Sequence, residues 1–266
     1  MESLAPLALG FVAGITVLFG TISIIYLGGR MGVRGIGFLN GLAGGVLAYL
    51  ALEAGSEASE LVEKYAKWDT LGEFSLAFIT TTIALIGTWM VLTYIEGGLR
   101  GSRGVFDERL TAYIVAIALG IHNVGEGFAI AASLLAGYVA SAVLFTAGFA
   151  IHNYTEGFAI AGPLMMKGAK RVEWRLLSLI AGLSLLAGLP VIPGALVYYL
   201  GFSSDIALAT LYTIATASIV YAMLHINLSA LSKLGGVSSP LFWISIFSGI
   251  GLAYTTETIL LFSLPS

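Results

Sequence analysis

Residues 110–166 read LTAYIVAIALGIHNVGEGFAIAASLLAGYVASAVLFTAGFAIHNYTEGFAIAGPLMM. The only formally charged side chains in these 57 residues are Glu126 and Glu156. A helix needs about 20 apolar residues to cross a membrane, so the stretch is too long for one span and suits two, with a turn near Gly137 and Tyr138. We therefore expect two consecutive antiparallel membrane helices, each with one carboxylate inside the bilayer.

The whole chain has the composition of a membrane protein. Of its 266 residues, 58% are hydrophobic and only 10% are charged, and the mean hydropathy is +0.96. Soluble domains carry about 25% charged residues and disordered chains are polar, so both classes are excluded. The lack of cysteine excludes a disulfide scaffold, an iron–sulfur cluster and a thiolate zinc site. The net charge of −3 offers no basic surface to nucleic acid.

Uncharged stretches elsewhere in the chain supply six further spans. The sequence predicts an all-α, polytopic membrane protein with a single transmembrane domain over residues 1–266 and helices at about 4–27, 33–54, 73–96, 109–135, 138–163, 174–200, 205–231 and 239–263. Ten of the 12 Lys and Arg residues fall in the loops after the first, third, fifth and seventh spans. Because cytoplasmic loops carry the excess of basic residues, both termini should lie outside. Glu2, in place of a basic segment, argues against a cleaved signal peptide.

The two central spans contain an internal repeat. Segments 121–131 and 151–161 are identical at nine of eleven positions, at an offset of 30 residues. In each copy a His, an Asn and a Glu project from one helix face, because they are spaced three and four residues apart; these residues are His122, Asn123, Glu126, His152, Asn153 and Glu156. Both motif centres lie about 15 residues, or about 22 Å, from the turn. The two motifs should therefore meet at one depth, near mid-membrane.

Such a cluster has a chemical reason to hold a cation. Ionisable side chains in the bilayer core are costly without a partner, and two neighbouring carboxylates repel each other. A divalent cation relieves both costs, and imidazole and carboxylate ligands without thiolate suit Zn²⁺, Fe²⁺, Mn²⁺ or Co²⁺. The alternative is that the polar groups only satisfy one another as the helices pack; duplication at one depth favours a metal site.

The pair of motifs, His-Asn-x-x-Glu-Gly at 122–127 and again at 152–157, resembles the paired signatures on the fourth and fifth membrane helices of the ZIP (Zrt/Irt-like) divalent-metal transporters. The resemblance implies a 3+2+3 arrangement, with an inverted repeat relating the first three spans to the last three. It also implies that the six motif residues bind the metal, that both termini lie outside, and that metal moves into the cytoplasm across the cell membrane.

The chain departs from the family pattern in three places. Gly125 and Thr155 stand where the family usually has Pro before each Glu. Many family members add a carboxylate from the sixth span, but here that span has none near Pro190 and Pro193, so one metal site is expected in preference to two. The two prolines should break the helix. The His-rich cytoplasmic loop common in the family is missing.

Four further residues are candidates for an ion pathway. Glu53 and Glu57, one turn apart at the outer end of the second span, could concentrate cations at an entrance, or form part of a solvated acidic loop. His225, in the seventh span, is interpreted either as a transient ligand on the exit path or as a hydrogen-bonded packing residue. Glu257, in the eighth span, is interpreted as a pairing partner, a proton carrier or a residue of an outer vestibule.

The sequence thus predicts a transporter, and not an enzyme, for a divalent cation. Zinc is the first expectation, with iron, manganese, cobalt or cadmium as alternatives, and the ion is transported substrate rather than a cofactor. Alternating exposure of the mid-membrane His/Asn/Glu site would move it. Two other functions stay open, a membrane-embedded metalloenzyme and a metal-stabilised channel. The partners expected are the metal ion and the lipid bilayer, with no nucleic acid; a homodimer is left open.

Overall fold

The computed structural model describes residues 4–28, 30–101, 107–165, 173–201 and 204–262, and all regular structure in these ranges is helical. The elements are α1 (Ala5–Gly28), α2 (Val33–Glu63), the 3-10 helix η1 (Trp68–Thr70), α3 (Leu71–Arg100), α4 (Glu108–Leu135), α5 (Val139–Leu164), α6 (Trp174–Gly188), α7 (Val191–Ala195), α8 (Val197–Leu200), α9 (Asp205–Leu234) and α10 (Pro240–Phe262). The predicted all-α class is confirmed.

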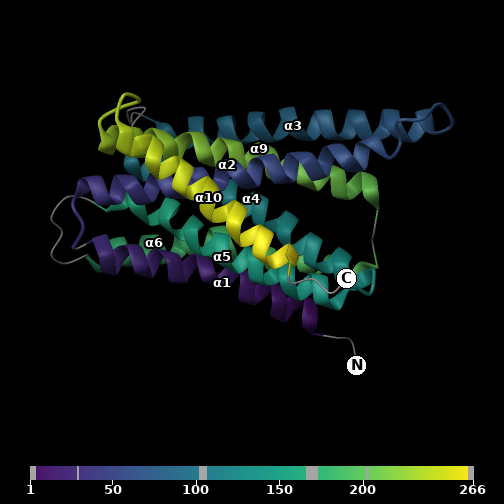
Figure 1. Cartoon of the computed structure of the whole chain (residues 1–266), viewed down its shortest axis with the longest axis horizontal. Coiled ribbons are helices and arrows are strands. Elements are labelled where there is room, and N and C mark those ends of the chain that lie inside the picture. The colour runs from purple at the N-terminus through teal and green to yellow at the C-terminus, as the bar shows by residue number, and fades with distance from the viewer. Residues whose placement is uncertain (1–3, 29, 102–106, 166–172, 202–203, 263–266) are drawn as a thin grey trace.

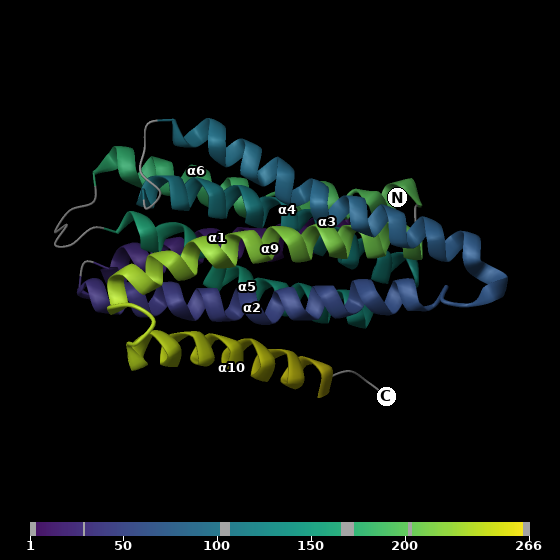
Figure 2. The ribbon, with the colours of Figure 1, turned by 90° about the horizontal axis from the view of Figure 1, so that it is seen from above.

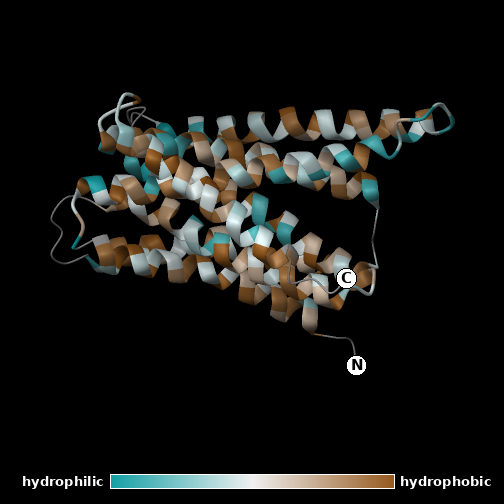
Figure 3. Ribbon diagram, viewed as in Figure 1, coloured by the Kyte–Doolittle hydropathy of each residue, from teal (hydrophilic) through white to brown (hydrophobic). Residues whose placement is uncertain are grey.

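Several helices are long and apolar enough to cross a membrane. Within the described residues six segments meet this criterion, namely Ala5–Leu27, Val33–Glu63, Trp68–Arg100, Glu108–Leu135, Trp174–Leu200 and Asp205–Leu234. Figure 3 shows hydrophobic residues along the lengths of the helices and hydrophilic residues gathered towards the ends of the bundle and in its middle. The chain is therefore a helical integral membrane protein, and α5 and α10 occupy the two remaining predicted spans.

The helices pack in two groups. In one group, α1 contacts α5 and α6, and α4 contacts α5, α6 and α7. In the other group, α2 contacts α9 and α10, and α3 contacts α9. The groups meet where α4 packs on α9 and α5 packs on α2. Because of these contacts, the two motif-bearing helices α4 and α5 lie where the groups join. Figures 1 and 2 show α10 alongside α2 at the outside of the bundle.

Glycines bring the helices of the first group into backbone contact. A Cβ added at Gly157 of α5 would lie 2.4 Å from the carbonyl oxygen of Val17 in α1. A Cβ added at Gly127 of α4 would lie 2.0 Å from the carbonyl oxygen of Val191 in α7. No side chain fits at such distances, so the Gly that follows each motif Glu is required for the close approach.

The same contacts reveal a second internal repeat. The pattern Ala-Gly-x-x-Val-x-x-Gly occurs at 13–20 in α1 and recurs at 187–194 across α6 and α7, at an offset of 174 residues. Gly14 and Gly188 lie against each other, since a Cβ on either would come within 2.2 Å of the other's carbonyl oxygen. Thus α1 packs on α5 as α6 and α7 pack on α4.

Two predicted spans differ from the helices. The second was expected to end near residue 54, but α2 continues to Glu63 because Ala54, Ala58 and Leu61 are buried at helical spacing. The sixth, expected over 174–200, is divided into α6, α7 and α8 around the predicted break. Proline has no N–H to continue the helical hydrogen bonds, and α6 ends two residues before Pro190.

The ends of the bundle differ in charge. Figure 1 shows α1, α3, α5 and α9 ending at one side of the molecule, while the described chain begins and ends towards the opposite side. The described basic residues at the first side are Arg30, Arg34, Arg100, Arg109, Arg175 and Lys233, and those at the second are Lys64 and Lys67, between α2 and α3. Arg103, Lys167, Lys170 and Arg171, which also enter the prediction of orientation, lie outside the described residues.

Candidate metal centre

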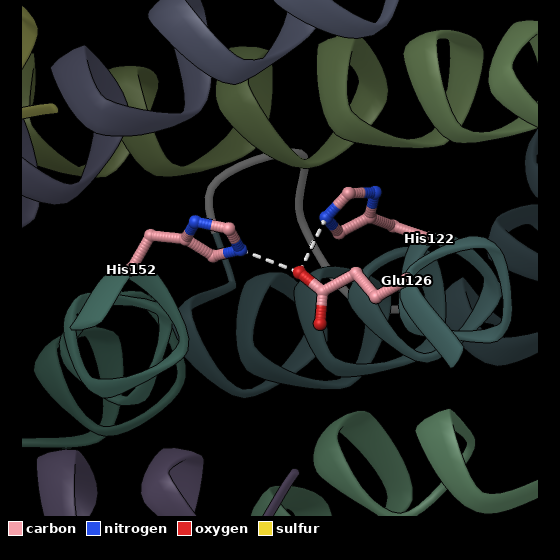
Figure 4. Close-up of side chains that lie close together, drawn as sticks. All are labelled: His122, Glu126 and His152. Atoms are coloured by element: carbon pink, nitrogen blue, oxygen red, sulfur yellow. Dashed lines mark hydrogen bonds and ion pairs between the residues drawn. The ribbon is translucent and has the colours of Figure 1, made fainter. Parts of the chain in front are cut away.

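Three motif side chains form the core of a buried cluster. His122 Nε2 and His152 Nε2 lie 3.2 Å and 2.5 Å from Glu126 Oε1, and one ligand atom from each residue lies within 4.8 Å of the others. Figure 4 shows the Glu126 carboxylate between the two imidazoles. His122 and Glu126 are one turn apart on α4, whereas His152 comes from α5. The structure thus brings both predicted motifs to one site.

Glu156 lies at the edge of this core. Its Oε1 atom is 3.9 Å from His122 Nε2, and the residue is only 1% exposed. Two buried carboxylates, Glu126 and Glu156, therefore approach the same imidazole. Their mutual repulsion in a low-dielectric interior favours a positively charged occupant.

The two asparagines contact the carboxylate of the opposite motif. Asn123 Nδ2 donates a hydrogen bond to Glu156 Oε2 (3.3 Å), and Asn153 Nδ2 donates one to Glu126 Oε2 (2.9 Å). The i,i+3 spacing places Asn and Glu of one motif on one helix face, but it gives no hint of this exchange between helices. All six predicted residues thus belong to one connected cluster.

Unpartnered polar atoms are concentrated here. Among the described residues, seven buried side-chain N and O atoms have no hydrogen-bond partner, and five belong to this cluster: His122 Nδ1, His122 Nε2, Asn123 Oδ1, Asn153 Oδ1 and Glu156 Oε1. Buried polar groups are normally satisfied, and each that is not costs about 1–3 kcal/mol. Most of these atoms are acceptors, so a cation is the kind of species that would satisfy them.

A cavity of 260 Å³ reaches the cluster from one side. His152 and Thr155 of α5 line it, together with the predicted pathway residues Glu53 and Glu57 of α2 and Glu257 of α10. All three carboxylates therefore share one cavity with His152 of the cluster. Tyr49, which the sequence did not single out, also lines the cavity and donates a hydrogen bond to Glu257 Oε2.

His225 lies outside the cluster, on α9. Its Nδ1 atom is 2.9 Å from the carbonyl oxygen of Tyr221, and its Nε2 atom is 3.2 Å from Glu96 Oε2. Glu96 also accepts hydrogen bonds from the Tyr221 hydroxyl and from Arg100. Sequence reasoning missed Glu96, although its i,i+4 spacing from Arg100 was a signal for an ion pair. In this structure His225 is a hydrogen-bonded packing residue, and its contact with a passing ion stays a prediction.

A second polar network joins the two helix groups at the side where α9 ends. Glu108, at the start of α4, pairs with Lys233 and accepts a hydrogen bond of 2.8 Å from Ser229 Oγ, both from α9. Asn40 Nδ2 of α2 donates to the same Ser229 Oγ at 3.1 Å. This network therefore connects the motif-bearing helix α4 to α2 and α9.

Comparison of the chain with protein-family models and with curated proteins finds no match. The chemistry of the site is therefore inferred from its own geometry. That geometry offers two imidazole nitrogens and two carboxylates at one buried point, a ligand set suited to a first-row divalent cation.

Proposed function

We propose that this protein transports a divalent metal cation across a membrane, with His122, Glu126, His152 and Glu156 as its binding site. One observation carries the proposal: the cluster is buried in the middle of membrane-spanning helices and holds five polar atoms that make no hydrogen bond. Intramembrane ionisable residues are expensive and typically serve ion pathways. A cation passing through the site would compensate that cost while bound.

The cavity supports a pathway to the site. Glu53, Glu57, Glu257 and His152 all line it. Carboxylates in a concave, low-dielectric site raise the local concentration of cations. We propose that a cation passes these carboxylates before it reaches the imidazoles.

The resemblance to ZIP transporters extends this proposal. By this resemblance, the proposal includes a 3+2+3 arrangement with an inverted repeat. It also places both termini outside and has metal moving into the cytoplasm of the cell. The recurrence of the α1 pattern in α6 and α7 supports an inverted repeat, and the basic residues at the side where α9 ends support the orientation. Zinc is the first metal to test, because imidazole and carboxylate ligands form its usual four-coordinate sites.

Flux measurements in proteoliposomes test the proposal. Wild-type protein should take up radioactive zinc saturably, and iron, manganese, cobalt or cadmium should compete. Glu126→Ala and His152→Ala each remove a ligand from the core and should reduce uptake at least tenfold. Glu63→Gln, which changes an exposed carboxylate at the end of α2, is the matched control and should transport normally. Undiminished uptake in both site variants would overturn the proposal. Metal binding by the wild-type protein without any flux would also overturn it, because the metal would then be a resident ion and not a transported one.

A further inference from the structure

We infer that Asn123 and Asn153 are positioning residues that hold each other's motif in place, and so determine which cations the site accepts. Each asparagine fixes one oxygen of the opposite carboxylate and leaves the other oxygen free to face the imidazoles. Because the positioned carboxylates are the proposed cation ligands, this role rests on the proposed function.

Both amide hydrogens of each asparagine are used. Asn123 Nδ2 donates to Glu156 Oε2 at 3.3 Å and to the carbonyl oxygen of Ala187 in α6 at 2.9 Å. Asn153 Nδ2 donates to Glu126 Oε2 at 2.9 Å and to the carbonyl oxygen of Ala13 in α1 at 3.3 Å. Carbonyl and carboxylate oxygens only accept, so only the amide nitrogen can face them.

The two sets of bonds are equivalent. Asn123 and Asn153 are related by the 30-residue offset of the motifs, and Ala13 and Ala187 by the 174-residue offset of the second repeat. The close contact of Gly14 with Gly188 lies next to both carbonyl groups. Each asparagine therefore ties its own helix to the opposite motif and to a third helix, which makes one braced unit of α1, α4, α5 and α6.

We call the four hydrogen bonds donated by Asn123 and Asn153 the braces. They determine which oxygen of each carboxylate faces the imidazoles. With Oε2 of Glu126 bound by Asn153, it is Oε1 that lies 3.2 Å and 2.5 Å from the two imidazole nitrogens. With Oε2 of Glu156 bound by Asn123, Oε1 is left without a partner, 3.9 Å from His122 Nε2. Each carboxylate therefore directs Oε1 towards the imidazoles and holds Oε2 against the opposite asparagine, an arrangement that favours binding of a cation through Oε1.

Carboxylates that bind through one oxygen restrict which cations the site accepts. Two imidazole nitrogens and two single oxygens make a four-ligand set of the kind that Zn²⁺ takes. Ca²⁺ takes six to eight oxygen ligands and often binds a carboxylate through both oxygens. The braces thus favour small four-coordinate divalent cations and disfavour Ca²⁺.

Asparagine-to-aspartate variants separate positioning from direct ligation. Asp keeps an oxygen at the position of the unpartnered Oδ1, but an ionised Asp cannot donate and it repels the carboxylate it should hold. We expect Asn123→Asp and Asn153→Asp each to weaken Zn²⁺ binding at least tenfold and to narrow the ratio of Zn²⁺ to Ca²⁺ affinity at least tenfold, as measured by titration of the purified full-length protein. If the asparagines act only as ligands, both variants should bind Zn²⁺ as tightly as wild type or more tightly, which would overturn the inference.

Uncharged variants keep the test decisive if the Asp variants fail to fold. Asn153→Ala frees Glu126 without adding charge, so the Zn²⁺ to Ca²⁺ ratio should again narrow. Loss of a neutral oxygen ligand alone would instead lower both affinities and leave the ratio unchanged, and that result would contradict positioning. Asn40→Asp is the control, because this buried asparagine on α2 donates to Ser229 and not to the cluster. It should lower thermal stability yet leave the affinity ratio within about twofold of wild type.

Thermal unfolding in a chelator distinguishes the two ways in which these ideas can fail. The braces are present without metal, so the Asp variants should melt at a lower temperature than wild type in the absence of any divalent ion. A wild-type protein that binds no divalent cation would refute the proposed function, while the melting shifts would still report on the braces. Normal metal binding by wild type together with unchanged melting temperatures and affinity ratios in the variants would refute the braces alone.

Discussion

At the scale of single residues, the glutamates of the two motif copies have different surroundings. Glu126 Oε1 contacts both imidazole nitrogens, while Glu156 Oε1 has no hydrogen-bond partner and lies 3.9 Å from one of them. His152 lines the acidic cavity, whereas Glu156 does not. A nearly exact sequence repeat therefore produces an asymmetric site, in which His152 is the motif residue that faces the cavity and contacts Glu126.

Imidazole ligation predicts a dependence of binding on pH. A proton and a metal compete for the same nitrogen lone pair, so metal affinity should fall as the pH falls. Titrations of Zn²⁺ into the purified protein between about pH 8 and pH 5 measure this. His122→Gln removes one competing imidazole and should flatten the dependence; an affinity that does not change across this range would argue against histidine ligands.

At the scale of elements, glycines at the helix crossings determine how closely the motif-bearing helices approach their neighbours. Gly157 lies on the carbonyl of Val17, and Gly127 lies on the carbonyl of Val191. Small residues at helix interfaces in membranes permit such approach and the dispersion contacts that follow. The Gly in each motif thus has a packing role distinct from the ligand role proposed for its neighbours.

This packing predicts that one added methyl group at Gly157 lowers the stability of the protein. A Cβ at Gly157 would meet main-chain atoms, which cannot move aside as the end of a side chain can. Gly157→Ala should destabilise the protein by about 1–3 kcal/mol, the usual range for overpacking, and lower its melting temperature in detergent. Gly182→Ala on α6, where an added Cβ meets nothing within 4 Å, is the control and should leave the melting temperature unchanged or slightly raised. Equal melting temperatures for the two variants would contradict the crossing as described.

At the scale of the whole molecule, the acidic cavity and the Glu108–Lys233 network lie towards opposite ends of the helices. The cavity is lined by residues near the end of α2, such as Glu57, whereas the network involves the start of α4 and the end of α9. The network also includes Ser229 and Asn40, so it links the two helix groups at the end away from the cavity.

Loss of this link should expose that end without weakening the proposed metal site. Lys233→Gln removes the ion pair between α4 and α9 and should favour their separation. The chain has no cysteine, so a single Ala230→Cys, at a position that is 0% exposed, reports on opening through its rate of thiol labelling. We expect faster labelling in the Lys233→Gln background and an unchanged Zn²⁺ affinity.

Two comparisons control the labelling experiment. Ser178→Cys, at an exposed position on α6, should react equally fast with and without the Lys233 substitution. The exchange Glu108→Lys with Lys233→Glu should restore slow labelling of Cys at position 230, because the opposite charges are again paired. Slow labelling in every background would show that the network does not hold the two groups together.

Sequence reasoning succeeded where the cause is local. Runs of apolar residues require membrane helices, and the spacing of His122 and Glu126 on one turn requires a shared helix face. It failed at the end of the second span, because Ala54 and Ala58 signal burial only through a 3.6-residue period that charged neighbours obscure. It also missed Glu96 and Tyr49, whose importance depends on partners 125 and 208 residues away.

The sequence by itself determined that this is a helical membrane protein and that two copies of one polar motif lie in consecutive helices. Hydrophobic length and helical periodicity act within a single segment, so they can be seen before folding. Only the tertiary structure decided that each asparagine serves the other motif's glutamate, and that α1 and α6 supply the second acceptors. Those pairings depend on which backbones cross at glycine and at what depth, and such distances exist only once the helices have packed.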